Sequence, residues 1–371
     1  MSPLVIAVRA CISLLFNPKR YSERDIRTIA VLQPAKMGDM VCTTPLFRAI
    51  KKHLPHVRVV VLGDAINRAV LEGNQDVDRY IVCTESTFLN AVEELRSEHV
   101  DVGLVATPTA LGISLFALSG AGAIVAPKIE NGWSPHETKT YRLLRFFVTA
   151  APHRMRHYAP SEYLRLLEPI GIHEDNTDKH LVVSSAARTR AAELLSHIPT
   201  GTKIVGIAAS AGNKAKQWPP ERFARVAEHI ARTYGAHIVL TGSARDRVPV
   251  MALAGALPAS VPVTNLLEKL SVEELKAVIQ TLDLFVALDT GPIYIAEALG
   301  IPTVDIVGPV DPNEQPPQGP FHLVVTPPEP YTPATYVMNS RSYDKELAER
   351  LNLSITPEVV IAAVDTLMAK R

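Results

Sequence analysis

Charged side chains follow several short apolar runs of this sequence, beginning with Asp39 near the N-terminus. The segment Lys36-Met37-Gly38-Asp39 comes two residues after the apolar run Thr28–Gln33. Gly38 allows the backbone to turn tightly, and Asp39 then opens a predicted helix. A carboxylate at that place can cap the helix by accepting backbone N–H groups, or it can accept a proton from an attacking hydroxyl. The residues alone leave both interpretations open.

A second segment of this kind suits a phosphate-bearing ligand. Asp289-Thr290-Gly291-Pro292 follows the apolar run Leu284–Ala287, and a helix is predicted to begin at the proline. The N–H groups and the positive dipole end of a helix attract anions. Thr290 and Gly291 therefore stand where a phosphate would lie, and a capped helix start without a ligand is the alternative.

The segment Ser210–Pro220 in the same half of the chain combines small residues with two lysines. Small residues allow a ligand to approach the backbone, and a lysine such as Lys216 supplies the charge that suits a diphosphate. Solvated surface lysines are the alternative interpretation. The turn Leu240–Ser243, after another apolar run, is a weaker signal for a bound nucleoside.

Other residue patterns point away from metals and redox chemistry. Asp76-Val77-Asp78 has a spacing that can hold a divalent cation, but it leads directly into a predicted strand, which favours a surface turn. No histidine pair has convincing zinc-ligand spacing, and the phosphate loop of nucleotide triphosphatases is absent. Three cysteines without a Cys-x-x-Cys pair fit free thiols in the reducing cytoplasm. We therefore expect no metal and no cofactor.

The elements that position these residues alternate between strands and helices in both halves of the chain, which predicts two parallel-sheet α/β domains. The predicted strands are Thr28–Gln33, Arg58–Leu62, Tyr80–Cys83, Val102–Ala106, Ala123–Ala126, Lys203–Ala208, His237–Thr241, Leu284–Ala287 and Thr303–Val307. Apolar residues at helical spacing predict helices over Thr44–Leu54, Glu221–Tyr234 and Pro357–Met368. In such domains a ligand lies at the carboxyl ends of the strands.

The length of 371 residues exceeds what one hydrophobic core usually serves. We predict a first domain over 25–185 and a second over 200–371, and the prolines clustered in 311–335 predict a loop there. Lys+Arg and Asp+Glu are both 38, so the formal net charge is zero. A nucleic-acid-binding protein would usually show a basic surplus, and we expect no nucleic-acid partner.

The N-terminal segment, residues 1–24, is apolar but too short to span a bilayer, and Arg9 interrupts it. It predicts a helix that lies on a membrane surface or packs against the protein body. In the membrane interpretation one set of residues enters the interface and three basic residues meet anionic headgroups. These are Leu4, Val5, Ile6, Val8, Ile12, Leu14, Leu15 and Phe16, with Arg9, Lys19 and Arg20.

Taken in order, these motifs resemble those of glycosyltransferase family 9, the ADP-heptose:lipopolysaccharide heptosyltransferases and their relatives. The similar segments are Met37-Gly38-Asp39 with Thr44-Pro45, Lys216-Gln217-Trp218-Pro219, Leu270–Leu275 and Asp289-Thr290-Gly291-Pro292. The resemblance runs from about Ile29 to Pro312 and resumes at Ile355–Glu358.

The resemblance implies a GT-B fold, in which two doubly wound Rossmann-like domains face each other across a cleft. It also implies an inverting transfer of a heptose or related sugar, without a metal, from ADP-heptose to a lipopolysaccharide core or similar glycolipid. Asp39 would be the general base, with Lys36, Met37 and Gly38 on the acceptor side. The donor residues that it implies in the C-terminal domain are Ser210, Lys216, Asp246, Leu270, Asp289, Thr290, Gly291 and Tyr294.

Two residues depart from the family pattern. Tyr294 stands where the family often has histidine, and Gln33 where a base usually precedes the Gly-Asp pair; residues 313–343 also follow no family pattern. A transferase that uses another nucleotide sugar for capsule or O-chain synthesis therefore remains an alternative. A second alternative is a non-catalytic scaffold that binds a nucleotide sugar. A glycolipid acceptor would place the chain in the cytoplasm, at the inner face of the inner membrane.

Overall fold

The computed structural model describes residues 3–16, 26–340 and 343–370. The chain divides into two compact units, with the second beginning at Leu181, and a short segment that starts at Val337 belongs to the first unit. This segment is held there by a buried hydrogen bond of 2.6 Å from the Ser134 hydroxyl to the Met338 carbonyl oxygen. The predicted second domain, 200–371, is therefore interrupted in its C-terminal part, and residues 181–199 join it.

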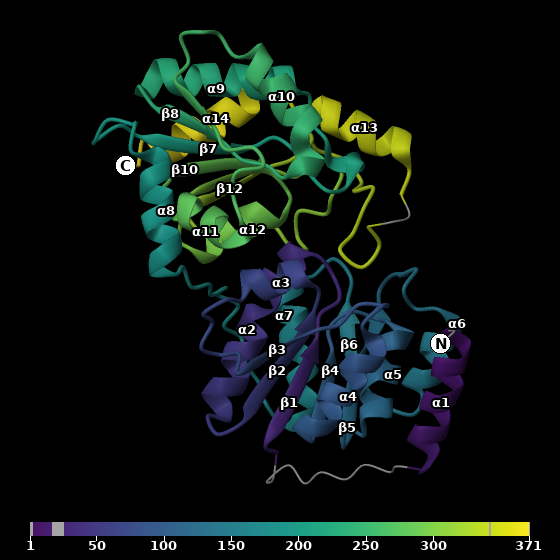
Figure 1. The fold of residues 1–371 in the computed structure, drawn as a ribbon. Helices are drawn as coiled ribbons and strands as arrows, with labels where there is room; N and C mark the ends of the chain where they lie inside the picture. The colour runs from purple at the N-terminus through teal and green to yellow at the C-terminus, as the bar shows by residue number, and fades with distance from the viewer. Residues whose placement is uncertain (1–2, 17–25, 341–342, 371) are drawn as a thin grey trace. The chain divides into compact units, whose positions relative to one another are not determined.

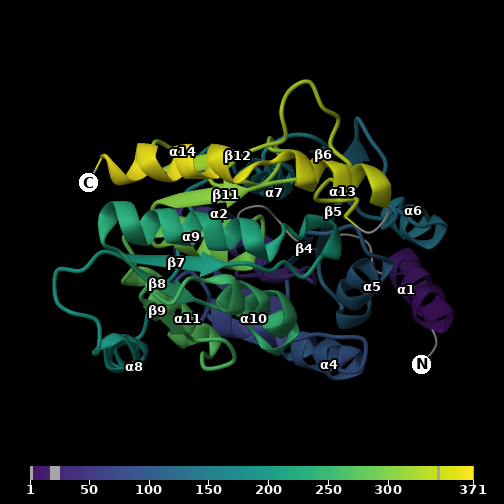
Figure 2. The same ribbon diagram turned by 90° about the horizontal axis from the view of Figure 1, so that it is seen from above.

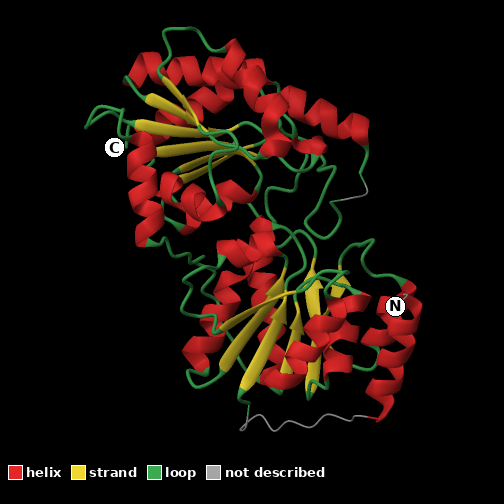
Figure 3. Cartoon of the chain, in the orientation of Figure 1, coloured by secondary structure: helices red, strands yellow, loops and turns green. Residues whose placement is uncertain are grey.

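The first unit is a parallel six-stranded sheet in the order β3-β2-β1-β4-β5-β6 (Figures 1 and 3). Its strands are β1 (Thr28–Leu32), β2 (Arg58–Gly63), β3 (Arg79–Val82), β4 (Val102–Val105), β5 (Ala123–Glu130) and β6 (Thr149–Arg154). Its helices are α1 (Pro3–Phe16), α2 (Met37–His53), α3 (Ala65–Val70), α4 (Phe88–Glu98), α5 (Ala110–Ser119), α6 (Lys139–Arg145), α7 (Ala159–Leu164) and the 3₁₀ helix η1 (Arg165–Ile170).

The second unit repeats this plan with a parallel sheet in the order β12-β11-β10-β7-β8-β9. Its strands are β7 (Ile204–Ala208), β8 (His237–Leu240), β9 (Val263–Asn265), β10 (Leu284–Leu288), β11 (Thr303–Ile306) and β12 (His322–Val325). Its helices are α8 (Ser185–Leu195), α9 (Pro220–Tyr234), α10 (Arg247–Ala256), α11 (Val272–Gln280), α12 (Gly291–Ala298), α13 (Lys345–Ser354) and α14 (Pro357–Met368), with short 3₁₀ helices η2 (Lys214–Lys216) and η3 (Ala244–Asp246).

Both sheets have a point where the strand order reverses. In the first unit it lies between the paired strands β1 and β4, and in the second between β7 and β10. The loops that leave two such strands diverge to opposite faces of the sheet, and ligands of doubly wound domains bind in the crevice between them. The loops after β1, β4, β7 and β10 are therefore the places where a site is expected.

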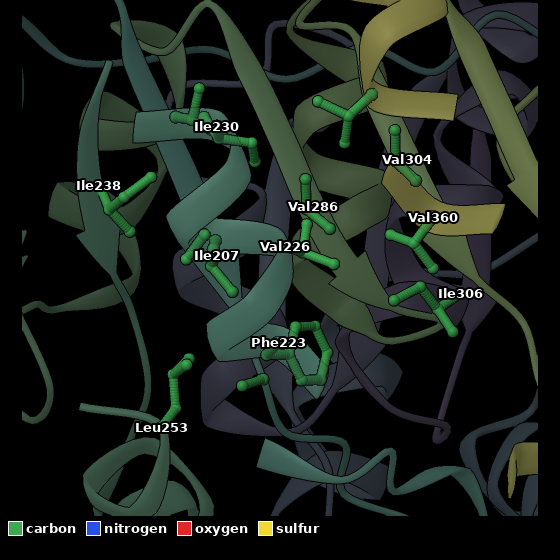
Figure 4. Close-up of a cluster of buried hydrophobic side chains, with 14 of the residues drawn as sticks. Ile207, Phe223, Val226, Ile230, Ile238, Leu253, Val286, Val304, Ile306 and Val360 are labelled. Carbon is green, nitrogen blue, oxygen red and sulfur yellow. The ribbon is translucent and has the colours of Figure 1, made fainter. Parts of the chain in front are cut away.

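A continuous apolar core forms on one face of the second sheet (Figure 4). Phe223, Val226 and Ile230 project from α9 at helical spacing, while Val286 and Ile306 stand on the sheet beneath them. The strands β7, β10 and β11 are buried along nearly their whole length. Strands covered on both faces read as uninterrupted apolar runs, and this explains why the sequence predicted them.

All nine predicted strands are present, with ends that shift by a few residues. The strands β6, β9 and β12, each at an edge of its sheet, were not predicted. β12 contradicts the prediction that 311–335 is loop throughout, because His322–Val325 pairs in parallel with β11. Pro320 and Pro327 flank this strand and none lies within it, so proline removes no hydrogen bond from the ladder.

The N-terminal helix α1 packs against α5, and Figure 2 shows it beside α5 and α6. Ile6, Ala7 and Ala10 enter the core of the first unit, so the prediction that Ile6 faces a membrane is wrong. Lys19 and Arg20 lie outside the described residues. No single described helix is both long and apolar enough to span a bilayer, and only α13 and α14, bent by 56°, reach that length and composition as a pair.

Candidate active site

In the first unit, the loops after β1 and β4 are joined by a buried glutamine. The Gln33 side-chain amide donates to the Thr43 hydroxyl at 2.9 Å, and its side-chain oxygen accepts from the Thr107 hydroxyl at 2.9 Å. The Asn67 amide braces the same loop by donating to the Ala35 carbonyl oxygen at 2.8 Å. Gln33 therefore fixes the loop at the switch point, a role that the sequence analysis did not assign to it.

Asp39 lies in the first turn of α2, which begins at Met37, two residues before Asp39 and seven before the predicted range Thr44–Leu54. The N-cap of this helix is Lys36, whose side chain makes no capping hydrogen bond. Gly38 is buried within the helix, so its predicted role in a tight turn is wrong. Asp39 is not the N-cap residue either, and its half-buried carboxylate lies at the positive end of the helix dipole.

In the second unit, an ion pair crosses the switch point between the loops after β7 and β10. The Lys216 ammonium lies 2.5 Å from Asp289 Oδ2 and 3.0 Å from the Asp289 carbonyl oxygen. The Asp289 side chain is buried, whereas 17% of the Lys216 side chain is exposed. The Lys216 ammonium is therefore held at the carboxyl ends of the strands, where Ser210 also accepts a hydrogen bond from Gln217 at 3.3 Å.

The segment around Lys216 is rigidly anchored. Trp218 is buried, and its indole N–H donates to the Ile355 carbonyl oxygen at 3.0 Å. The Trp218 ring also packs edge-on against Phe223, with ring centroids 4.8 Å apart. The Asn352 amide donates to the Ala215 carbonyl oxygen, one residue before the lysine. The Lys-x-Trp-Pro segment thus uses its tryptophan to fix its lysine.

The N-terminus of α12 lies beside this ion pair and is arranged to receive an anion. The helix begins at Gly291, one residue before the predicted start, with Thr290 as an N-cap whose side chain makes no capping hydrogen bond. Pro292 has no N–H, and the Ile293 amide donates to the Thr290 carbonyl oxygen at 3.0 Å. The hydroxyl of Thr290 and the amides of Thr290 and Gly291 are therefore the groups at this end that suit a phosphate.

Two buried polar side chains lie close to Asp289: Tyr294, which the sequence analysis placed among the donor residues, and Asp305, which it missed. The Tyr294 hydroxyl donates to Asp289 Oδ1, so Tyr294 holds the carboxylate from behind. Asp305 on β11 is completely buried, and both of its oxygens lack a hydrogen-bond partner among the described residues. Burial, followed by the charge of Asp289, raises the pKa of the Asp305 carboxyl well above its ordinary value. An aspartate inside the apolar strand Thr303–Ile306 was the signal available in the sequence.

Asp246 and Leu270 lie on two loops that the backbone joins. The Glu268 amide donates to the Gly242 carbonyl oxygen at 2.8 Å, which links the loops after β8 and β9. Asp246 Oδ2 accepts from the amide and the hydroxyl of Ser243, at 2.8 Å and 2.7 Å. One carboxylate oxygen of Asp246 therefore caps a short helix. Leu270 is half-buried and lies two residues before α11.

The Asp76–Asp78 segment has a structural role. Asp78 Oδ2 lies 2.6 Å from both the Lys51 ammonium and the Val59 amide nitrogen, so this carboxylate is already engaged. Within the described ranges, no group of three or more His, Cys, Asp or Glu side chains is placed to hold a metal ion. The three cysteines are free thiols, and burial raises the pKa of the Cys83 thiol to about 11.

Comparison with known proteins gives one family. Residues 124–340, more than half of the chain, match the sequence model of glycosyltransferase family 9 (heptosyltransferase). The chain is 25% identical over 286 residues to lipopolysaccharide heptosyltransferase 3 of Escherichia coli, covering 74% of this chain and 81% of that protein. It is also 25% identical over 278 residues to lipooligosaccharide heptosyltransferase 2 of Campylobacter jejuni, covering 74% and 80%.

Solved structures share the fold over almost the whole chain. A glycosyltransferase family 9 protein of Veillonella parvula has a TM-score of 0.77 at 22% identity, covering 96% of this chain and all (100%) of that one. The ADP-heptose lipopolysaccharide heptosyltransferase II of Escherichia coli has a TM-score of 0.74 at 18% identity, covering 92% and 99%. At these identities the likeness shows the fold alone.

Proposed function

The chain belongs to glycosyltransferase family 9, the heptosyltransferase family, and from this premise we propose that it transfers a heptose from ADP-heptose to a lipopolysaccharide core or a similar glycolipid. Its two doubly wound domains are those of a GT-B glycosyltransferase. The observation that carries the proposal is the Lys216–Asp289 pair, which holds an ammonium beside the N-terminus of α12. A cation next to a helix N-terminus fits a diphosphate.

The donor would lie along the carboxyl ends of the second sheet. Its diphosphate would meet Lys216, Thr290 and Gly291, while its nucleoside would lie against the linked loops that carry Asp246 and Leu270. The buried Lys216–Asp289 contact supports this placement, because Asp289 aims the ammonium and Tyr294 in turn fixes Asp289. Ser210 lies on the same loop as Lys216 and would contact the donor from that side.

Asp39 would act as the general base. The acceptor hydroxyl oxygen attacks the anomeric carbon while its proton passes to the Asp39 carboxylate, and the bond from that carbon to the diphosphate oxygen breaks. The nucleoside diphosphate leaves with the bonding electrons, and Lys216 and the end of α12 stabilise its charge. A single displacement of this kind inverts the anomeric centre.

The acceptor would be a glycolipid, and we place the reaction at the cytoplasmic face of the inner membrane. What supports this placement is the helix α1, which packs on the protein with one face and exposes apolar side chains on the other. Lys36, Met37 and Gly38 would lie on the acceptor side of Asp39.

A panel of nucleotide sugars, each incubated with truncated lipopolysaccharide, tests the proposal through nucleotide release. We expect ADP release from ADP-heptose that depends on the acceptor. Turnover of a different nucleotide sugar would instead assign the chain to capsule or O-chain synthesis. Donor binding without release would make it a scaffold.

Asp39→Asn tests the base itself. We expect the variant to fold and to bind the donor. Its turnover should fall by about a hundredfold or more, the usual effect of losing a general base. Asp64→Asn is the matched control, because Asp64 caps α3 in the same unit by accepting from the Asn67 amide. Near-normal turnover in Asp39→Asn would rule out the base role.

A further inference from the structure

Two neighbouring helices of the first unit expose apolar side chains on their outward faces. In α1, Leu4, Val8, Leu15 and Phe16 follow one another at helical spacing on the face opposite the buried Ile6 and Ala10. The helix is apolar on nearly all sides, yet only one side is covered. A helix of this composition is normally buried all round, so its exposed face lacks an apolar partner within the described protein.

The helix α6 repeats the pattern next to α1, with which it is in contact (Figures 1 and 2). Tyr141 and Leu144 point into the same core that holds Ile6. Leu143 and Phe146, at the outer end of this helix, are 56% and 84% exposed. Phe146 is therefore almost fully exposed, although it lies only one residue past the end of α6.

The charge on these helices is of one sign. Neither α1 nor α6 contains aspartate or glutamate, while Arg9 lies on the first and Lys139, Arg142 and Arg145 on the second. Glu137 pairs with Arg145 and lies 4.0 Å from Arg142, which leaves the surface with a basic excess. Protein–protein interfaces are depleted of lysine, whereas apolar side chains bordered by lysine and arginine favour anionic lipid surfaces.

We propose that the exposed faces of α1 and α6 form one docking surface for an anionic lipid bilayer, with Leu4, Val8, Leu15, Phe16, Leu143 and Phe146 entering the interface. The inference deepens the proposed function, on which it rests, because a glycolipid acceptor lies in such a bilayer. Fixing α1 to the protein through Ile6 and through the Ser13 hydroxyl, which donates to the Ala117 carbonyl oxygen at 2.7 Å, sets the orientation in which the first unit meets the membrane.

Cosedimentation of the full chain with vesicles tests this surface. The vesicles consist of phosphatidylcholine with or without phosphatidylglycerol. We expect Leu15→Ser and Phe146→Ser each to lower partition into mixed vesicles by about tenfold, since each withdraws one large apolar side chain from the interface. Phe321→Ser is the matched control, because Phe321 is 49% exposed in the other unit; it should partition as the unaltered chain does.

Lys139→Gln separates the electrostatic contribution. It should lower partition about fivefold on vesicles that contain phosphatidylglycerol and leave binding to phosphatidylcholine alone unchanged. The inference is overturned if the unaltered chain binds neither vesicle, or if Leu15→Ser and Phe146→Ser bind as well as it does. It is also overturned if these variants dissociate a dimer and leave vesicle binding unchanged, which would make a second copy the occupant.

Transfer to detergent-dispersed acceptor distinguishes this inference from the proposed function. The surface variants should release nucleotide at the normal rate in that assay, because none of the substituted residues belongs to the proposed donor or acceptor site. Normal transfer without vesicle binding would refute the docking surface and leave the function intact. Absence of transfer by the unaltered chain would refute the function, whatever the vesicles show.

Discussion

The Lys216 ammonium is the group on which the proposed donor site depends, and its surroundings support that proposal. Asp289 balances its charge from a buried position, Tyr294 supports Asp289, and the buried Trp218 anchors the loop. A long lysine side chain held by two oxygens loses little further conformational freedom when a diphosphate arrives. Preorganisation of this kind favours stabilisation of the leaving group over mere capture of the donor.

Lys216→Ala should weaken ADP binding by about 1.5–3 kcal/mol, the value of a charge-assisted contact to phosphate. It should also lower the unfolding temperature, because Asp289 stays buried without its cation. Lys214→Ala is the matched control: Lys214 lies two residues away and is exposed. Titration calorimetry with ADP measures both variants, and equal affinity in Lys216→Ala would show that the donor site has been misplaced.

Asp305 predicts a pH dependence of stability. Its raised pKa means that the folded state binds this proton more tightly than the unfolded state, in which the pKa is about 3.9. The free energy of unfolding therefore falls as the pH rises from about 4 to the raised pKa of Asp305. Asp305→Asn cannot ionise, so its free energy of unfolding should exceed that of the unaltered chain by a margin that grows from pH 4 to neutrality.

Urea unfolding at several pH values measures this margin. The exposed Asp175→Asn controls for the loss of a carboxylate as such. A margin for Asp305→Asn that does not change with pH would show that the pKa of Asp305 is the same in the folded and the unfolded protein.

The helix α1 illustrates how one element can serve the fold and the surface together. Sequence analysis offered packing and membrane contact as alternatives for this segment, but the described helix packs in the core with one face and exposes apolar side chains on the other, so both roles are compatible. Deleting the segment would therefore remove part of the core along with any membrane contact. Point substitutions on one face at a time separate the two roles.

Ile6→Ala should lower the free energy of unfolding by about 2–4 kcal/mol, because it leaves a cavity between α1 and α5. Ile12→Ala, on the exposed face of the same helix, should change it by less than about 0.5 kcal/mol. Ile6 is 6% exposed and Ile12 is 51% exposed, so the pair isolates burial at constant chemistry. Equal effects in chemical denaturation would mean that α1 does not dock onto the first unit in solution.

Taken as a whole, the chain carries no net charge, and the groups proposed to bind phosphate lie together at one switch point. Lysine and a helix N-terminus can meet a diphosphate without a metal ion. Turnover should therefore survive EDTA at the rate seen with added magnesium. A strict requirement for Mg²⁺ or Mn²⁺, restored when the metal is returned, would contradict this mechanism and reopen Asp76 as a ligand.

The residues of the proposed site could be predicted from the sequence because they follow buried strands. A parallel strand covered on both faces reads as an apolar run, and the residue after it lies at the carboxyl edge where ligands bind. Asp39, Lys216, Thr290 and Gly291 were identified in this way. The edge strands β6, β9 and β12 were missed because each is only partly buried, which leaves no continuous apolar run to recognise.

Three features depended on contacts between residues far apart in the chain. Asp289 follows β10, and Asp305 lies on β11. Only the pairing of these two strands brings both carboxyls beneath α12. The apolar sequence of α1 does not reveal which of its faces will find a partner, and α5 decides that. The segment at Val337 likewise joins the first unit through Ser134, which lies 204 residues before its partner Met338. The spacing of apolar residues along the chain determines which helix or strand a residue belongs to. The burial and electrostatic environment of that residue depend on which other elements the fold places beside it.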